Sequence, residues 1–175
     1  MNNNKKFFEE KGKLAVNKKI IAFDLDGTLA LSKMPVDKEM AKLFKELLSV
    51  KIVAVIGGGS YSLFKDQFLF SLNCSDKNLL KNLLLLPTSG STFCQYKNNK
   101  WDTVYKNILT EEEIKNITDE IMKVFDSVNN FIPDQIYGPR IEDRKTEVTF
   151  SALGMQAPLE KRKNGIKNMI YEEKW

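Results

Sequence analysis

The stretch that decides the fold of this chain is Lys19-Ile20-Ile21-Ala22-Phe23-Asp24-Leu25-Asp26-Gly27-Thr28-Leu29. Its first five residues predict a buried β-strand, because an apolar run of this length bounded by turn residues is typical of one. Two carboxylates follow at the strand's carboxyl end, at Asp24 and Asp26. Regular alternation would send both to the same side, where they would repel each other and lose water.

A divalent cation would relieve the repulsion between these two carboxylates, and Mg²⁺ is the usual hard cation for carboxylate oxygens. Gly27 allows the backbone to turn sharply out of the strand, and Thr28 offers a hydroxyl group to orient a neighbour. The alternative is an ordinary strand-to-loop turn, for which Asp-Gly is a common dipeptide. That alternative does not explain Asp24, which would end the strand with an unpaired charge.

The motif from Phe23 to Leu29 resembles the first signature of the haloacid dehalogenase-like phosphotransferases. The resemblance implies that Asp24 is a nucleophile that becomes an aspartyl-phosphate, and that Asp26 is a general acid and base. It also implies a Mg²⁺ cofactor held by Asp24 and the backbone carbonyl of Asp26. The chain contains no histidine, so no imidazole can take the acid-base role.

Composition predicts a cytoplasmic protein with an ordinary hydrophobic core. The chain has 175 residues, 42% of them hydrophobic, and a net charge of +4. Its lysines are scattered, which favours a solvated surface over nucleic-acid binding. Cys74 and Cys94 have neither metal-ligand spacing nor a histidine partner, so we expect reduced thiols. No segment is long and apolar enough to cross a membrane, and residues 1–17 predict a polar leader.

Strands and helices alternate through the first half of the chain. Strands are predicted at 19–23, 52–56 and 83–86, with helices at 37–48 and 62–72, and Asp37 is a suitable N-cap. This order predicts an α/β fold with a doubly wound sheet, in which ligands bind beyond the carboxyl ends of the strands. We therefore expect residues 18–90 to form a haloacid dehalogenase-like core with Asp24 and Asp26 at that edge.

A glycine-rich turn, Gly57-Gly58-Gly59-Ser60, follows the second strand and is expected at the same edge. The resembled superfamily has Ser or Thr at the position of Gly57, to hold the transferring phosphate, whereas Ser60 is near but shifted. The backbone amides of Gly57–Gly59 form an anion-binding nest in one interpretation. In the other, the glycines only serve a tight turn.

The second half of the chain changes pattern. A hairpin is predicted over 92–105, then a helix with a capping box of Thr110 and Glu113, then an alternating strand over 146–153. We expect a separate α+β domain over residues 91–175, and the resemblance to the superfamily implies that it is a cap inserted after the third strand, with a surface for a homodimer.

Part of this second half resembles the cap of phosphomannomutase-like members of the superfamily, on Ile141-Glu142-Asp143-Arg144, Thr149–Gly154 and Gln156–Glu160. The resemblance implies that Arg144 and Ser151, with Arg140 beside them, hold the distal phosphate of a sugar phosphate. A guanidinium group can grip phosphate through two hydrogen bonds. The alternative for Arg144 is a surface salt bridge with Glu142 or Glu147.

The resemblance implies Mg²⁺-dependent phosphoryl transfer on a hexose phosphate, of the phosphomannomutase type. A sugar-phosphate phosphatase is the alternative within the same chemistry. The family's remaining core residues, a Lys and an acidic pair, lie beyond the cap, and residues 161–175 contain no such motif. We therefore expect the chain to lack part of the core, which leaves a third alternative, a non-catalytic protein that binds phosphosugars.

Overall fold

The computed structural model describes residues 18–32, 34–127, 133, 135–158 and 160–162, and the predicted leader lies outside them. The chain divides into two compact units, residues 1–107 and 108–175. Each unit is described by itself below. Within the described residues no helix is both long and apolar enough to cross a membrane.

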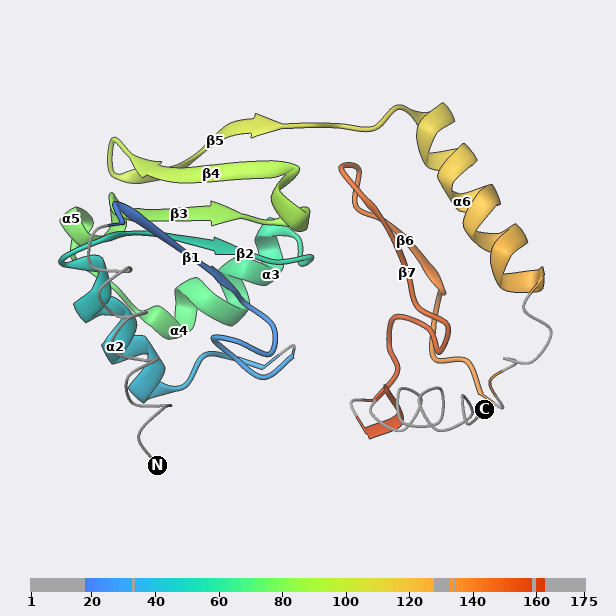
Figure 1. Cartoon of the computed structure of the whole chain (residues 1–175), viewed down its shortest axis with the longest axis horizontal. Coiled ribbons are helices and arrows are strands. Elements are labelled where there is room, and N and C mark those ends of the chain that lie inside the picture. The colour runs from blue at the N-terminus through green and yellow to red at the C-terminus, as the bar shows by residue number, and fades with distance from the viewer. Residues whose placement is uncertain (1–17, 33, 128–132, 134, 159, 163–175) are drawn as a thin grey trace, which may run out of the picture. The chain divides into compact units, whose positions relative to one another are not determined.

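The first unit is built on one five-stranded sheet with the order β1-β2-β3-β4-β5 (Figure 1). The strands are β1 (Ile20–Asp24), β2 (Ile52–Ile56), β3 (Leu83–Leu86), β4 (Thr92–Lys97) and β5 (Lys100–Lys106). The first three pair in parallel, and β4 and β5 pair antiparallel. The α/β class and the first three strands are therefore confirmed, with boundaries shifted by at most one residue.

The hairpin β4–β5 corrects the predicted domain boundary. Leu84 and Leu85 of β3 pair with Gln95 and Cys94 of β4, so the hairpin extends the core sheet. The division between the units follows Asn107 rather than residue 90. Sequence alone identified the hairpin but not its partner, since pairing with β3 is a non-local contact.

The helices of the first unit cover one face of its sheet (Figure 1). They are α2 (Lys38–Leu48), α3 (Tyr61–Phe64), the π-helical turn η1 (Lys65–Leu69), α4 (Phe70–Leu72) and α5 (Lys77–Leu80). Their apolar side chains meet alternate residues of the strands, such as Val53, Val55 and Leu85, which are fully buried. Asp37 caps α2 as predicted, because its Oδ1 accepts a 2.8 Å hydrogen bond from the Met40 amide.

The opposite face of the sheet is less covered by the described residues. Ile20 and Ile52 share this face through the parallel register, and they are 51% and 38% exposed. A doubly wound sheet has helices on both faces. Within the described part of the chain, α2 to α5 supply one of these two layers.

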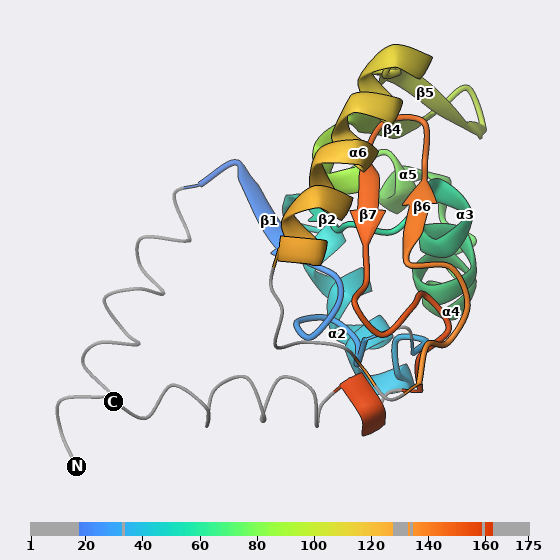
Figure 2. The ribbon, with the colours of Figure 1, turned by 90° about the vertical axis from the view of Figure 1, so that its right-hand side faces the viewer.

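The second unit combines one helix with one hairpin, which is an α+β arrangement. Helix α6 (Glu111–Ser127) begins at the predicted capping box, where the Thr110 amide donates to Glu113 Oε2 at 2.7 Å. Strands β6 (Ile141–Asp143) and β7 (Val148–Phe150) pair antiparallel beside it (Figure 2). Phe125 and Phe150 join helix and hairpin, with ring centroids 5.1 Å apart.

Candidate active site

Three loops meet at the carboxyl edge of the parallel strands. The register places Asp24 opposite Ile56, and Ile56 opposite Leu86, so β1, β2 and β3 end together. The loops that follow these strands contain residues 25–30, 57–60 and 87–91. The sequence therefore placed the acidic motif and the glycine-rich turn correctly on one sheet edge.

The loop after β1 is tightly bound to itself and to the sheet. The Leu25 amide donates to the Ile56 carbonyl at 3.0 Å, and the amides of Leu29 and Ala30 both donate to the Leu25 carbonyl at 3.1 Å. Leu25 and Leu29 are 2% and 5% exposed, so they anchor the loop in the core. Gly27 has a φ of +85°, a backbone conformation that glycine adopts without strain. The loop is thus a rigid support for its polar side chains.

Asp24 and Asp26 carry those side chains, and both residues are exposed. Asp24 has no ion pair among the described residues, and Thr28 Oγ1 donates a long hydrogen bond of 3.5 Å to its Oδ2. Asp26 accepts a 2.9 Å hydrogen bond at Oδ1 from Nε2 of Gln67. Gln67 belongs to η1 and was not among the predicted site residues.

A Mg²⁺ ion fits this donor set only as a partly hydrated ion. No group of three or more acidic, cysteine or histidine side chains gathers anywhere among the described residues. Mg²⁺ commonly keeps several waters and uses one or two carboxylates together with substrate phosphates. The Asp24 carboxylate and the Asp26 carbonyl oxygen are the groups that would hold it here.

The glycine-rich turn does not form the anion nest through Gly57. The Gly57 amide donates to the Leu86 carbonyl at 3.3 Å, so it belongs to the sheet. A nest alternates residues of helical φ with residues of positive φ. None of the three glycines Gly57, Gly58 and Gly59 has a positive φ. Ser60 is the N-cap of α3, and its Oγ accepts from the Leu63 amide at 3.4 Å. No positive φ requires glycine in this turn either, and what restricts Gly57 is packing, since a Cβ there would lie 3.3 Å from Cζ of Phe64.

The loop after β3 was missed by the sequence reasoning. Thr88 and Ser89 have φ values of +50° and +55°, followed by Gly90 at +86°. Their amides donate to the carbonyls of Gly59 and Gly57 at 2.9 Å, which ties this loop to the glycine turn. Positive φ at a β-branched residue such as Thr88 is uncommon and collects at functional sites. Ser89 is exposed at this edge.

In the second unit, Arg144 is bound by two carboxylates, which is the salt-bridge alternative. Its Nη2 lies 2.7 Å from Glu142 Oε2, and its Nη1 lies 2.9 Å from Glu147 Oε1. Burial alone would lower the pKa of Arg144, but these two carboxylates raise it above its usual value. The guanidinium donors that were expected to hold a phosphate are thus directed at glutamates of the same hairpin.

The other two predicted residues of the second unit differ from each other. Ser151 Oγ donates to the Gly154 carbonyl at 3.0 Å, so this hydroxyl closes a turn. The Arg140 guanidinium lies over the Phe125 ring, 4.6 Å from its centroid. Its Nε is buried and has no hydrogen-bond partner among the described residues. Arg140, rather than Arg144, is therefore the cation with unused donor capacity.

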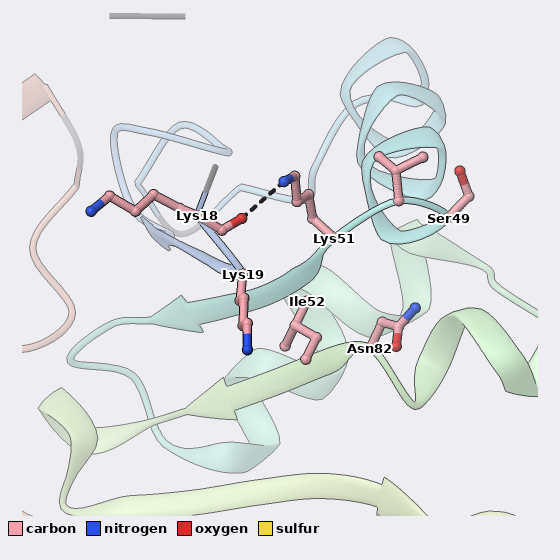
Figure 3. A pocket seen from close by; sticks show the side chains of 7 residues that line it. Lys18, Lys19, Ser49, Lys51, Ile52 and Asn82 are labelled. Carbon is pink, nitrogen blue, oxygen red and sulfur yellow. Dashed lines mark hydrogen bonds between the residues drawn. The ribbon is translucent and has the colours of Figure 1, made fainter. Parts of the chain in front are cut away.

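Two hollows among the described residues lie near the sheet, and Phe23, Thr28 and Leu29 of the acidic motif line the smaller one. One, of about 440 Å³, is at the amino edge, and it is lined by Lys18, Lys19, Ser49, Val50, Lys51, Ile52 and Asn82 (Figure 3). The Lys51 ammonium donates to the Lys18 carbonyl there at 2.9 Å. The other, of about 200 Å³, is apolar and separates β1 from α2, next to Thr28. The structure brings together lysines that appear scattered in the sequence.

No protein-family model matches this chain, and no curated protein matches it. Among solved structures, the N-terminally truncated IMP-nucleotidase of Plasmodium falciparum with bound IMP aligns at 14% identity and a TM-score of 0.55. That alignment covers 93% of this chain and 49% of the other. Another structure of the N-terminally truncated enzyme aligns at 16% identity and a TM-score of 0.56, over 86% and 48% of the two chains.

A haloacid dehalogenase-like hydrolase from B. subtilis aligns more loosely, at 20% identity and a TM-score of 0.45, over 64% of this chain and 34% of that one. At such identities the likeness shows the fold alone. The chain has an α/β fold similar to that of the IMP-nucleotidase structures. It spans about half the length of the IMP-nucleotidase structures.

Proposed function

We propose that this chain carries the nucleophilic half of a phosphoryl-transfer site that acts on a phosphate monoester. The observation that carries the proposal is Asp24, a carboxylate at the end of β1 with no ion pair among the described residues. The loop that follows it is rigid, so the carboxylate is presented at a fixed place on the sheet edge. A charge that the fold leaves without a counter-ion is suited to a cation and a reacting group.

The proposed reaction has two steps. An Asp24 oxygen attacks phosphorus, the ester P–O bond breaks, and Asp26 gives its proton to the leaving oxygen. A second oxygen nucleophile then attacks the aspartyl-phosphate, loses its proton to Asp26 and restores the Asp24 carboxylate. A Mg²⁺ ion, when bound, neutralises charge on the phosphoryl oxygens.

The second nucleophile decides the class of reaction. Water would make the chain part of a phosphatase, and a sugar hydroxyl would make it part of a mutase. Hydrolysis requires no held acceptor, and the distal-phosphate contact through Arg144 is not supported, so we favour hydrolysis. The resemblance of the second unit suggests a hexose phosphate as substrate. The likeness to IMP-nucleotidase suggests a nucleoside monophosphate such as IMP.

Substituting Asp24 tests the proposal. Asp24→Asn should reduce release of inorganic phosphate on the order of 10⁴-fold, because removing a covalent nucleophile costs this much or more. Asp26→Asn should reduce it about 10²-fold or more, the usual scale for a general acid or base. Glucose 6-phosphate and IMP serve as the two substrates, and beryllium fluoride should modify Asp24 in the unaltered protein.

Asp37→Asn is the matched control, since asparagine also caps helices and Asp37 lies at the start of α2. It should keep full activity. Equal activity in Asp24→Asn and the unaltered protein would overturn the proposal. Binding of a phosphosugar without any turnover would instead favour the non-catalytic alternative, which the absent hydroxyl at Gly57 supports.

A further inference from the structure

Gln67 is an unusual polar residue in the core of the first unit. It is 5% exposed and stands between Phe64 and Phe68, which are both fully buried. Phe68 packs edge-on against Phe44 of α2, with ring centroids 5.1 Å apart. A buried amide loses its hydration, so it is normally tolerated only where hydrogen bonds replace the water.

The Gln67 amide group is only half satisfied in this position. Its Nε2 donates to Asp26 Oδ1 at 2.9 Å, while its Oε1 is buried and has no partner among the described residues. In the second step of the proposed reaction Asp26 accepts a proton as a carboxylate, and a carboxylate oxygen takes the donor that the Gln67 amide nitrogen supplies. A buried oxygen without a partner lowers stability, so the position of Gln67 is not explained by stability alone.

The backbone around Gln67 is specialised as well. The helix from Tyr61 to Leu72 is interrupted by η1, where the Phe70 amide donates to the Lys65 carbonyl five residues earlier. Such π-helical turns are rare and are often found at functional sites. The Gln67 carbonyl also accepts from the Val36 amide at 3.2 Å. Both ends of the residue thus hold the segment that follows β1.

We propose that Gln67 is a positioning residue for Asp26. From the π-helical turn η1, the Gln67 amide holds the carboxylate of Asp26, the proposed acid-base residue. The inference rests on the proposed function for the role of Asp26. A neutral amide suits this task because it fixes the direction of the carboxylate without forming an ion pair with it. Catalytic groups lose about 10²-fold in rate when they are displaced by about 1 Å.

Gln67→Met tests this role, since methionine is unbranched, fills a similar volume and cannot donate to Asp26. We expect kcat to fall between about 10- and 100-fold, the range for losing a supporting hydrogen bond, with KM changed less than about threefold. The midpoint of denaturant unfolding should stay the same or rise, because the buried oxygen is removed. Gln95→Met, on β4, is the matched control and should keep its kcat.

A spectroscopic arm separates this inference from the proposed function. In protein labelled with ¹³C at the aspartate carboxyl carbons, the Asp26 resonance, identified through Asp26→Asn, should move in Gln67→Met. The resonance of Asp37 should stay in place. Conversely, the Gln67 side-chain amide resonances should move in Asp26→Asn, which serves if Gln67→Met fails to fold.

The outcomes distinguish the two claims. A chain without phosphatase or mutase activity whose Asp26 and Gln67 resonances respond to each other would overturn the proposed function and keep the positioning contact. An active chain with unchanged kcat in Gln67→Met, or with resonances that do not respond, would overturn the role of Gln67. A fall in kcat accompanied by shifts at Asp37 would show general disruption and also count against it.

Discussion

Asp24 and Arg144 carry opposite charges and have opposite surroundings. Two glutamate carboxylates lie within 2.9 Å of the Arg144 guanidinium, and its side chain is 14% exposed. Asp24 is exposed, has no ion pair among the described residues, and accepts a long hydrogen bond of 3.5 Å from Thr28 Oγ1. The fold therefore neutralises the charge in the second unit and leaves the charge at the sheet edge for something else. Two different resemblances had implied their roles, Asp24 as the nucleophile and Arg144 as a ligand of the distal phosphate with a salt bridge as the alternative.

The largest effect on stability is expected at Arg144. Arg144→Met should lower the free energy of unfolding by about 1–3 kcal/mol, because it leaves Glu142 and Glu147 without their donor in a partly buried place. Denaturant unfolding at neutral pH measures this. Lys123→Met is the control, since its pair with Glu120 is mostly exposed and should contribute little to stability.

For Asp24, in contrast, substitution should hardly change the stability of the fold. Asp24→Asn should leave the free energy of unfolding within about 0.5 kcal/mol of the unaltered protein, as an exposed substitution without a structural partner does. A large loss of stability in Asp24→Asn, or no loss in Arg144→Met, would mean that the two charges do not differ as described.

For substrate binding, Arg140→Ala should raise KM more than Arg144→Ala does.

A smaller effect is expected at Gly57, where the sequence suggested a missing hydroxyl. A Cβ at this position would lie 3.3 Å from Cζ of Phe64, which is fully buried and cannot easily move. Gly57→Ser should therefore lower the free energy of unfolding by about 1–2 kcal/mol, the usual cost of overpacking. Gly59→Ser should cost less, since its nearest side-chain atom is the Leu63 Cβ at 3.4 Å.

Thermal or denaturant unfolding of the two serine variants decides between these sites. If Gly57→Ser were both stable and more active, the protein would lack a useful hydroxyl group at this position, and packing would not require glycine there. If neither variant changed stability, Phe64 would have room to shift. Either result would sharpen how much of the sheet edge is shaped by the core beneath it.

The smallest effect concerns Cys94, a group that burial keeps neutral. Burial raises the pKa of the Cys94 thiol, although a hydrogen bond with Thr103 lowers it in part. Above the ordinary thiol pKa of about 8.5 the unfolded chain loses this proton first, so stability should fall with rising pH. The loss begins there and continues until the raised pKa of the folded state is passed.

Between about pH 7.5 and 10, a range around the ordinary thiol pKa, the free energy of unfolding should fall less steeply in Cys94→Ala than in the unaltered protein. Burial also raises the pKa of Tyr61, so part of the slope should remain. Alkylation gives an independent check, because the half-buried Cys74 should react before the buried Cys94. An equal slope in both proteins would show that the thiol does not contribute.

Local patterns predicted the local parts of this fold well. The apolar runs located the three parallel strands, and the caps at Asp37 and Thr110 marked helix starts because their hydrogen bonds span three residues. Local patterns could not predict which strand the hairpin β4–β5 would pair with. A hairpin carries no local mark of the strand that it will join, and the pairing of Leu84 with Gln95 depends on the whole sheet.

In the candidate site, too, local sequence predicted some residues, whereas others depend on contacts distant in sequence. Asp24 and Asp26 could be located because two carboxylates at the end of an apolar strand are conspicuous. Gln67 could not, since its importance depends on a contact across 41 residues. One signal was available, a glutamine beside Phe68 within an apolar helical stripe. The partners of Arg144 were within three residues in sequence, yet a phosphate and a glutamate attract a guanidinium equally well.

The position of β1 in the sheet has a consequence for hydrogen exchange. The strand pairs with β2 on one side, and on its other side no strand lies among the described residues. Alternate amides of a strand point in opposite directions, so those of Ile21 and Phe23 point with Leu25 toward β2, whereas those of Ala22 and Asp24 point outward. Deuterium should therefore enter β1 at every second residue, and a protected Ala22 amide would reveal a neighbour on that edge.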